Sequence, residues 1–334
     1  MRGRGGGPSR APSARASFAT CHGDRPDGAL VTEAGKVVIA NDPVSYGAFE
    51  LTVGILPDVP DGDAVLDEVA GAGYAGIDLG PIGYLGDGDE LASSLRRRKL
   101  ALSGGFFELP FSDLTRMPAA LRGLGSLLDV FDAAGASNGL RAKPTLADIG
   151  SDLRRSRPGQ AANDPSLGFD HDTWKRFAEG VEMAVECCRA RRYEPTFHHE
   201  TGTHIEAPWE IEKVLELTSI GLCLDTGHLL LGGGDPVRAM REWGQRINHL
   251  HLKDARRSVV DGIVREAAPV AEIWRRQAFC RLGDGDLDVD AVLDAVRKSY
   301  AGWIVVEQDV LPDPDGRAAA DQRANREYLA ARGF

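Results

Sequence analysis

The sequence predicts an α/β fold, a single barrel of eight strand–helix units, and three observations support this prediction. From Val37 onward, short apolar runs alternate with amphipathic segments of helix length, which is typical of a parallel sheet. No linker divides the eight units, and eight parallel strands close into a barrel. An open doubly wound sheet would carry a Gly-x-Gly-x-x-Gly turn after its first strand, but Asn41-Asp-Pro-Val-Ser follows instead.

The elements are expected in strict alternation along the chain. Runs rich in Val, Ile, Leu and Phe predict strands at 37–40, 76–79, 101–107, within 140–148, and at 195–200, 222–225, 247–252 and 303–307. Apolar periodicity predicts helices at 63–70, 90–97, 117–133, 172–191, 208–217, 236–243 and 289–299. The fourth strand has the weakest pattern. After the strand that ends at Asp225, Thr226 and Gly227 are expected to turn the chain. Asp235-Pro236 is typical of a helix N-cap followed by the first helical position.

Two segments depart from this alternation. Residues 1–36 are rich in Gly, Arg, Ser and Pro and have little apolar periodicity, so we expect a disordered extension there and the barrel over 37–334. After the seventh strand, a long loop with a polar helix runs from Lys253 through Trp274 to Arg281. A loop of this length at the mouth of a barrel is typical of a lid or wall over a site.

The composition restricts the class of protein. A formal charge of -11 argues against a nucleic-acid surface, because neutralising phosphates requires a basic face. No apolar run approaches the roughly 18 residues of a membrane span. The 5 cysteines are odd in number and have no Cys-x-x-Cys spacing, which indicates a reducing, cytoplasmic location.

Ionisable side chains gather where the last four strands end. Glu200 closes the fifth strand and Asp225 the sixth, while His251 and Glu307 lie at the ends of the seventh and eighth. Side chains alternate along a strand, so residues two apart, such as His198 and Glu200, share a face. These four side chains are therefore expected to point into one barrel mouth, which is where such barrels place their chemistry.

This group of residue types predicts a divalent metal. Three carboxylates close together repel one another and so raise one another's pKa. A divalent cation between them removes this repulsion. Two Glu, one Asp and one His form an oxygen-rich set that suits Mn²⁺ or Co²⁺, with Mg²⁺ as a further candidate. Four protein ligands leave two octahedral positions for adjacent substrate oxygens.

The pattern resembles the xylose isomerase-like TIM barrels, which include sugar isomerases and epimerases and inosose dehydratases. In the ketose 3-epimerase branch, the metal ligands are Glu, Asp, His and Glu at the ends of strands five to eight; here these fall on Glu200, Asp225, His251 and Glu307. That branch also has a substrate-contacting Glu, a His and an Arg at fixed offsets from these ligands. The positions that match them here are Glu206, His228 and Arg257.

Within this superfamily, five stretches resemble inosose (2-keto-myo-inositol) dehydratases. They begin at Gly80, Asp225, Gly233, His249 and Gly283, and the long loop after strand seven is similar too. The chain departs from that group at Asp78, where a Glu is common, and at Tyr46, where a Trp is frequent. The resemblance implies a small keto-polyol or keto-sugar as the partner and allows a homo-oligomer.

The chemistry implied is proton removal beside a ketone. A ketone and neighbouring hydroxyl chelated by a divalent metal acidify the α C–H, and the metal stabilises the enediolate that forms. Expulsion of a β-hydroxyl from there makes the protein a dehydratase, our first hypothesis. Return of the proton to the other face makes it a ketose or keto-sugar epimerase or isomerase, the alternative. A keto-glycoside-cleaving enzyme and a non-catalytic sugar-binding barrel rank lower.

Individual roles follow from these two reactions. Glu200 and Glu307 are expected to flank the metal as the acid/base pair, and His228 to donate a proton to the leaving hydroxyl, with Lys253 as a weaker candidate. His198 is expected to line the substrate pocket. Two roles stay open for the remaining pair: Glu206 and Arg257 either bind substrate hydroxyls or form a salt bridge with each other.

Overall fold

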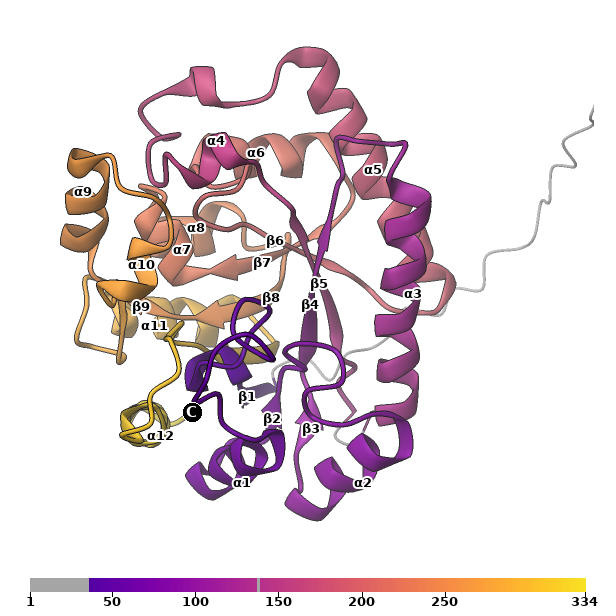
Figure 1. The fold of residues 1–334 in the computed structure, drawn as a ribbon, viewed down its shortest axis with the longest axis vertical. Coiled ribbons are helices and arrows are strands. Elements are labelled where there is room, and N and C mark those ends of the chain that lie inside the picture. Colours follow the sequence, from indigo (N-terminus) through magenta and orange to yellow (C-terminus); the bar gives the residue numbers. More distant parts are fainter. Residues whose placement is uncertain (1–35, 137–138) are drawn as a thin grey trace, which may run out of the picture. The chain divides into compact units, whose positions relative to one another are not determined.

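The sheet is a closed ring of parallel strands (Figure 1). The computed structural model describes residues 36–136 and 139–334. The ring contains β1 (Val37–Asn41), β2 (Gly76–Ile77), β3 (Ala101–Leu102), β4 (Gly104–Leu109), β5 (Lys143–Asp148), β6 (Thr196–His198), β7 (Gly221–Asp225), β8 (Ile247–Leu252) and β11 (Gly302–Val306). Their order is β3-β2-β1-β11-β8-β7-β6-β5-β4.

Ser103 joins the two ends of this order and closes the barrel. β3 pairs with β2 and β4 pairs with β5, so these two segments are halves of one barrel strand interrupted at Ser103. The Ser103 N–H donates to the Ile77 carbonyl at 2.9 Å, and the Ser103 carbonyl accepts from the Lys143 N–H at 2.9 Å. The predicted eight-stranded barrel is therefore confirmed, including the weak fourth strand, which is β5.

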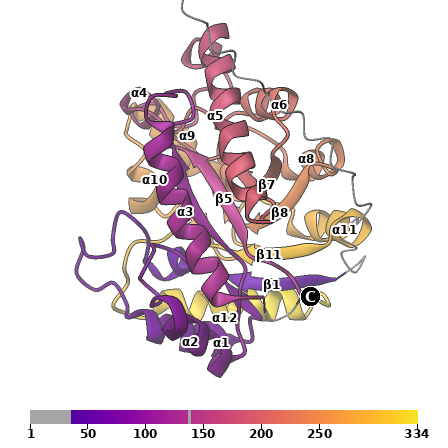
Figure 2. The same ribbon diagram turned by 90° about the vertical axis from the view of Figure 1, so that its right-hand side faces the viewer.

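Helices cover the outside of the ring, with α1, α2 and α12 near one another in Figure 2. They are α1 (Gly62–Ala72), α2 (Gly88–Arg98), α3 (Met117–Ala134), α4 (Asp152–Arg155), α5 (His171–Ala190), α6 (Pro208–Leu217), α7 (Thr226–Leu231), α8 (Pro236–Glu242), α9 (Arg257–Glu266), α10 (Glu272–Arg275), α11 (Val289–Ser299) and α12 (Arg317–Ala330). Two short 3-10 helices, η1 (Pro43–Tyr46) and η2 (Pro165–Leu167), lie in loops. The seven predicted helices are all present.

Local capping explains where two of these helices begin. Asp235 caps α8 as predicted, because its side chain accepts from the backbone N–H groups of Val237 and Arg238. The segment after Asp225 is a correction: we expected a turn at Thr226 and Gly227, but these residues start α7. The Asp225 Oδ1 accepts the His228 N–H at 2.8 Å, so a carboxylate in the site is also a helix cap.

The barrel interior changes from apolar to polar along its axis. At the N-terminal end of the strands, a small apolar cluster that includes Val38, Trp303 and Val305 fills the barrel. A Cβ at position 76 would lie 2.7 Å from the Trp303 ring, so only glycine fits at Gly76. Toward the C-terminal end the inward-facing side chains become ionisable. The barrel is therefore packed with apolar side chains at its N-terminal end and carries charged side chains at its C-terminal mouth.

The predicted long loop follows β8, the seventh strand of the barrel. It contains α9 and α10, and its ends pair as β9 (Asp254–Ala255) and β10 (Phe279–Cys280) in an antiparallel ladder. Asp254 ties the ends together, since its carboxylate accepts from the N–H groups of Gly283 at 2.9 Å, Gly285 at 3.0 Å and Leu287 at 3.0 Å. The two ends of the long loop are thus held together beside the mouth of the barrel.

Three sequence predictions concern regions at the margins of the fold. The predicted extension lies outside the described residues except for Lys36, whose carbonyl accepts the Gly302 N–H at 3.0 Å. In residues 36–136 and 139–334, no helix is long and apolar enough to cross a membrane. Cys187, Cys188, Cys223 and Cys280 are free thiols, and Cys21 lies outside the described residues.

Candidate active site

Three of the four predicted metal ligands meet at the barrel mouth. Asp225 of β7 is in register with His251 of β8, and His251 is in register with Val305 of β11, two residues before Glu307. The ligand atoms of Asp225, His251 and Glu307 all lie within 4.8 Å of one another. His251 Nδ1 is 3.0 Å from Glu307 Oε1 and 3.8 Å from Asp225 Oδ2.

Lys253 lies among these acids, together with Asp309, which the sequence interpretation missed. The Lys253 ammonium is 3.0 Å from Asp225 Oδ2, 2.8 Å from Glu307 Oε2 and 2.7 Å from Asp309 Oδ1. All four side chains are almost fully buried. Asp309 could have been found from its spacing, because it follows Glu307 by two residues at the end of the last strand.

These charges perturb one another strongly. Burial alone would raise the pKa of Glu307, but His251 and Lys253 outweigh burial and hold it well below its usual range. Burial would lower the pKa of Lys253, yet Asp225, Asp309 and Glu307 raise it well above its ordinary value. The lysine is therefore a permanent cation. Burial would lower the pKa of His251, but Cys223 and Glu307 outweigh burial and raise it well above its ordinary value. Lys253 and His251 together therefore face three carboxylates, and the group keeps an excess of negative charge.

Glu200, the fourth predicted ligand, lies in the same pocket but outside this group. It lines the cavity together with His251, Lys253 and Glu307. Its carboxylate belongs to none of the groups of candidate ligand atoms among the described residues. β6 ends at His198, and Glu200 enters a tight loop in which its N–H donates to the Ile205 carbonyl at 3.0 Å. Burial raises the pKa of Glu200 to about 7.

Two predicted histidines also line this pocket. His228 Nε2 is 3.4 Å from Asp309 Oδ2, and its Nδ1 is 3.0 Å from the Thr201 hydroxyl. Burial and Lys253 lower the pKa of His228, but Asp225 and Asp309 outweigh them and raise it. His198 Nε2 lies 3.4 Å from Asp225 Oδ2, while burial lowers the pKa of His198 to about 4 and keeps it neutral.

Glu206 and Arg257 are not brought together. Glu206 is buried, with its Oε2 accepting the Gly202 N–H at 2.5 Å, and burial raises its pKa to about 7. Arg257 is exposed and lines another cavity beside Asp261. Among the described residues, no ion pair joins Glu206 to Arg257, and neither lines the pocket of Glu307. The sequence offsets alone did not indicate how the two loops run.

A second polar layer lies one step deeper in the barrel. Asp78 accepts a hydrogen bond from the Ser103 hydroxyl, and burial raises its pKa to about 6. His249 is fully buried, and neither of its ring nitrogens has a hydrogen-bond partner among the described residues. Ligand atoms of Asp78, His249 and His251 lie within 4.8 Å of one another. The two-residue spacing of His249 and His251 was the available signal.

One side of the pocket is aromatic. Phe49, Phe106 and Trp274 line it, and all three are partly exposed. The rings of Phe49 and Trp274 stack with centroids 6.0 Å apart, so the loop after β1 touches the long loop after β8. Phe106 packs edge-on against His198, with centroids 5.6 Å apart. Phe49 and Trp274 were not among the predicted site residues, because their loops meet only in the folded chain.

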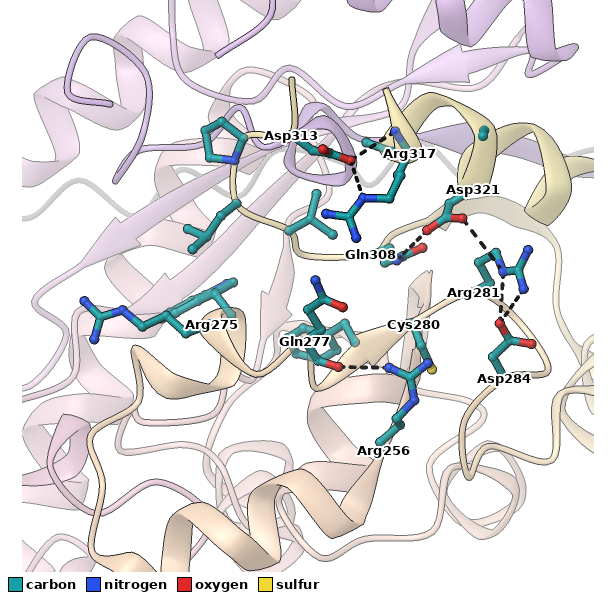
Figure 3. A pocket seen from close by; sticks show the side chains of 17 residues that line it. Arg256, Arg275, Gln277, Cys280, Arg281, Asp284, Gln308, Asp313, Arg317 and Asp321 are labelled. Atoms are coloured by element: carbon teal, nitrogen blue, oxygen red, sulfur yellow. Dashed lines mark hydrogen bonds and ion pairs between the residues drawn. The ribbon is translucent and has the colours of Figure 1, made fainter. Parts of the chain in front are cut away.

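A larger cavity, which Trp274 also lines, is shown in Figure 3. Its volume is about 400 Å³, against about 90 Å³ for the pocket of Glu307. Ion pairs occupy its walls: Arg281 bonds Asp284 at 2.8 Å, and Arg317 bonds Asp313 at 3.2 Å. These acids are thus held by arginines, and Arg256 bonds the Gln277 carbonyl at 3.1 Å, so size does not identify the reactive site here. The smaller pocket holds the unbalanced charge.

A closed barrel whose strand ends carry buried carboxylates, histidines and a lysine has the architecture of a barrel enzyme. Comparison with known proteins agrees and is more specific. Residues 66–330 match the xylose isomerase-like TIM barrel family, and the chain belongs to that family. The resemblance seen in the motifs is thereby confirmed.

Individual relatives narrow the class further. The chain is 28% identical over 255 residues to an inosose dehydratase of Geobacillus kaustophilus (strain HTA426), which covers 75% of this chain and 80% of the relative. Two solved structures share the fold. A probable 3-DHS dehydratase from Bacillus anthracis has a TM-score of 0.60 at 13% identity, covering 88% of this chain and 98% of that one. An L-ribulose 3-epimerase has a TM-score of 0.61 at 16% identity, with coverage of 88% and 94%. The chain is an enzyme of the dehydratase or the isomerase/epimerase kind.

Proposed function

We propose that this enzyme is a divalent-metal-dependent dehydratase that acts on a keto-polyol of the inosose type. The observation that carries the proposal is the buried group of Asp225, His251 and Glu307, whose ligand atoms lie within 4.8 Å of one another at the mouth of the barrel. The named relatives, which are inosose dehydratases, support the reaction class.

The residues fit a divalent cation. Two carboxylates and an imidazole supply oxygen and nitrogen donors of the kind that Mn²⁺ and Co²⁺ accept. Lys253 alone does not balance the three carboxylates around it, and a bound divalent ion would replace the proton of His251 as the further positive charge. When bound, the metal would polarise the substrate carbonyl and acidify the neighbouring C–H.

The protein side chains supply the remaining steps. Glu200 lines the pocket outside the ligand group, and its pKa of about 7 suits a base that removes the α-proton near neutral pH. His228, whose pKa Asp225 and Asp309 raise, is the proton donor to the departing β-hydroxyl, which leaves as water. Lys253 positions the carboxylates of Asp225, Glu307 and Asp309 through its three N–H donors. The neutral His198 lines the pocket as an uncharged hydrogen-bonding group.

Epimerisation is the second candidate, and one observation favours it. Glu200 and Glu307 both line the pocket, while only Glu307 belongs to the ligand group, so one carboxylate is free to deliver a proton to the opposite face. After the first proton transfer, the same two carboxylates are compatible with dehydration and with epimerisation. The fate of the β-hydroxyl decides between them.

Proton NMR in D₂O distinguishes the two reactions. Protein reconstituted with Mn²⁺ is incubated with inosose in one tube and with ketohexoses in another, and the metal is chelated before acquisition. Conversion of inosose to a dehydrated dione is the expected result. Deuterium beside an intact carbonyl with an inverted hydroxyl would establish the epimerase instead, and absence of exchange in every tube would contradict both.

A further inference from the structure

The pocket has two unlike halves. Its floor is ionic, with Lys253, Glu307 and Asp309 almost fully buried. Its wall is apolar, with Val44, Ala48, Phe49, Phe106 and Trp274 lining it. The floor matches a substrate part rich in oxygen, and the wall matches a part that prefers to leave water.

The apolar wall continues outward onto two neighbouring loops. We call Leu51, Ile55, Leu56 and Ile82 the apolar rim. Their exposed fractions are 61%, 66%, 41% and 46%, which is high for large aliphatic side chains. Leu51 follows Phe49 and Glu50, which line the pocket, and Ile82 follows Gly80, which lines it too. The rim therefore begins within two residues of pocket-lining positions on both loops.

The two loops of the rim are joined to each other. They follow β1 and β2, which are paired neighbours in the barrel (Figure 1). The Tyr84 hydroxyl of the second loop donates to the Pro60 carbonyl of the first at 2.7 Å. In the first loop, successive turns bind Thr52 N–H to Phe49 O and Leu56 N–H to Thr52 O, at 2.9 and 2.8 Å. The rim is thus held in place beside the mouth.

Isolated exposed leucines are ordinary, but a group of them at the edge of a pocket marks an interaction surface. Leu217 shows the contrast: it is 38% exposed, but it ends α6 just before β7 begins, at the opposite end of the barrel. A free cyclitol ketone carries oxygen on each ring carbon and would leave both the aromatic wall and the rim in water.

We propose that the substrate carries an apolar group, aromatic or aliphatic, attached to the keto-polyol, and that this group binds across Phe49 and the apolar rim. The inference rests on the proposed function, since it takes the ionic floor as the seat of the keto-polyol. Burial of about 55 Å² of apolar surface gives a tenfold gain in affinity, and a phenyl ring offers more than that.

The test compares a methyl and a phenyl glycoside of the same 3-keto-aldohexose, in which the ketone at carbon 3 is separate from the anomeric carbon and stays free. Isothermal titration calorimetry with the Mn²⁺-loaded protein measures the binding of each, and NMR in D₂O measures the exchange of the proton next to the ketone. We expect the phenyl glycoside to bind at least about tenfold more tightly. Equal affinities for the two glycosides would overturn the inference.

Variants then locate the effect. In the double variant Leu51→Ser/Ile55→Ser, the ratio of phenyl to methyl affinity falls toward one, whereas Leu217→Ser, matched in chemistry but at the other end of the barrel, keeps the wild-type ratio. Retention of the full ratio by the double variant would contradict the assignment to the rim. A change from dimer to monomer in sedimentation velocity, with the ratio intact, would assign the rim to self-association and overturn the proposal as well.

The two proposals fail separately. Preferential binding of the phenyl glycoside without proton exchange in either glycoside supports the amphiphilic substrate and contradicts the enediolate chemistry. Proton exchange at equal rates and with equal affinities supports the chemistry and contradicts the apolar group.

Discussion

Two buried ionic groups of this molecule differ in their balance of charge. Arg154 and Glu210 form a closed pair: Nη1 and Nη2 bond Oε1 and Oε2 at 2.7 and 3.0 Å, and both side chains have 0% exposure. Lys253 instead meets three carboxylates, from Asp225, Glu307 and Asp309. The first group has one cation for one anion, and the second has an uncompensated excess of negative charge.

The difference separates a structural role from a reactive one. A matched buried pair holds segments together, since Glu210 also accepts the N–H groups of Glu206 and Ala207 at 2.9 Å and so fixes the start of α6. An unmatched group is costly to bury, and such groups persist where a ligand or reaction uses the charge. The comparison predicts that changes in the two groups will affect different properties.

The largest effect is expected on stability, from Arg154→Met. The change leaves the Glu210 carboxylate buried without its cation, which costs about 3–5 kcal/mol. Urea denaturation measures the loss, and the double variant Arg154→Met/Glu210→Gln should recover part of it. Arg155→Met is the matched control, because its pair with Asp152 is exposed and worth less than about 1 kcal/mol. Equal losses for Arg154→Met and Arg155→Met would contradict the structural role.

Lys253→Met should act mainly on turnover. Loss of the ammonium removes the cation that faces Asp225, Glu307 and Asp309, and we expect the rate of α-proton exchange with inosose to fall at least about 100-fold. Unfolding in urea with saturating Mn²⁺ should change less than in Arg154→Met. Lys213→Met, at an exposed pair with Glu216, serves as the control. Full turnover in Lys253→Met would remove this lysine from the mechanism.

Metal should stabilise the wild-type protein. A ligand at 100 times its Kd adds about 2.7 kcal/mol to the free energy of unfolding, so Mn²⁺ should raise Tm by several degrees over the chelated protein. Asp225→Asn should lose most of this gain because it removes one ligand charge. Asp235→Asn keeps a capping side chain outside the ligand group and should retain the gain. A wild-type Tm that does not respond to Mn²⁺ or Co²⁺ would contradict the metal site.

The smallest expected effect is a pH dependence of the free energy of unfolding. It comes from Glu206, whose N–H donates to Glu210, the partner of Arg154. Burial raises the pKa of Glu206 from 4.5 to about 7, so between these values the folded protein binds more protons than the unfolded chain. The contribution of Glu206 therefore lowers stability as pH rises through this window. Glu206→Gln removes it.

Urea denaturation of the wild type and of Glu206→Gln, from pH 4.5 to 7.5, measures this contribution. The variant should gain about 2–3 kcal/mol relative to the wild type over the range. Glu212→Gln, at an exposed position on α6, the helix that begins two residues after Glu206, should show no such trend. Parallel pH profiles for the wild type and Glu206→Gln would show that this carboxyl keeps its ordinary pKa in the folded protein.

The sequence predicted the barrel and brought together three of its four candidate ligands, because both results follow from local periodicity. Alternation along strands places Asp225, His251 and Glu307 on inward faces, and parallel pairing then brings them together. Glu200 was harder to place, because β6 ends at His198 and tertiary bonds in the next loop set the direction of its side chain.

Contacts between loops were beyond the reach of local patterns. The stacking of Phe49 on Trp274 joins segments more than 200 residues apart in sequence, and no periodicity encodes it. The separation of Glu206 from Arg257 has the same origin, since each follows its own loop away from the strand that precedes it. The prediction of a turn after Asp225 was wrong for a different reason. The Asp225 carboxylate caps the short helix α7, and the glycines in and after this segment had pointed to a turn instead.

Asp254 gives the long loop an independence that bears on how such enzymes diversify. Its carboxylate binds N–H groups on both sides of the excursion, at Ala255 and at Gly283, Gly285 and Leu287, so entry and exit are fastened at one point. The segment between these points is therefore anchored apart from the barrel strands, and it reaches the mouth at two places. Trp274 stacks on Phe49, while Phe279 packs on His228 and under the Lys253 ammonium, with distances of 5.0 and 4.9 Å. A change in this one excursion would thus alter both what the mouth accepts and the surroundings of the groups that carry its charge.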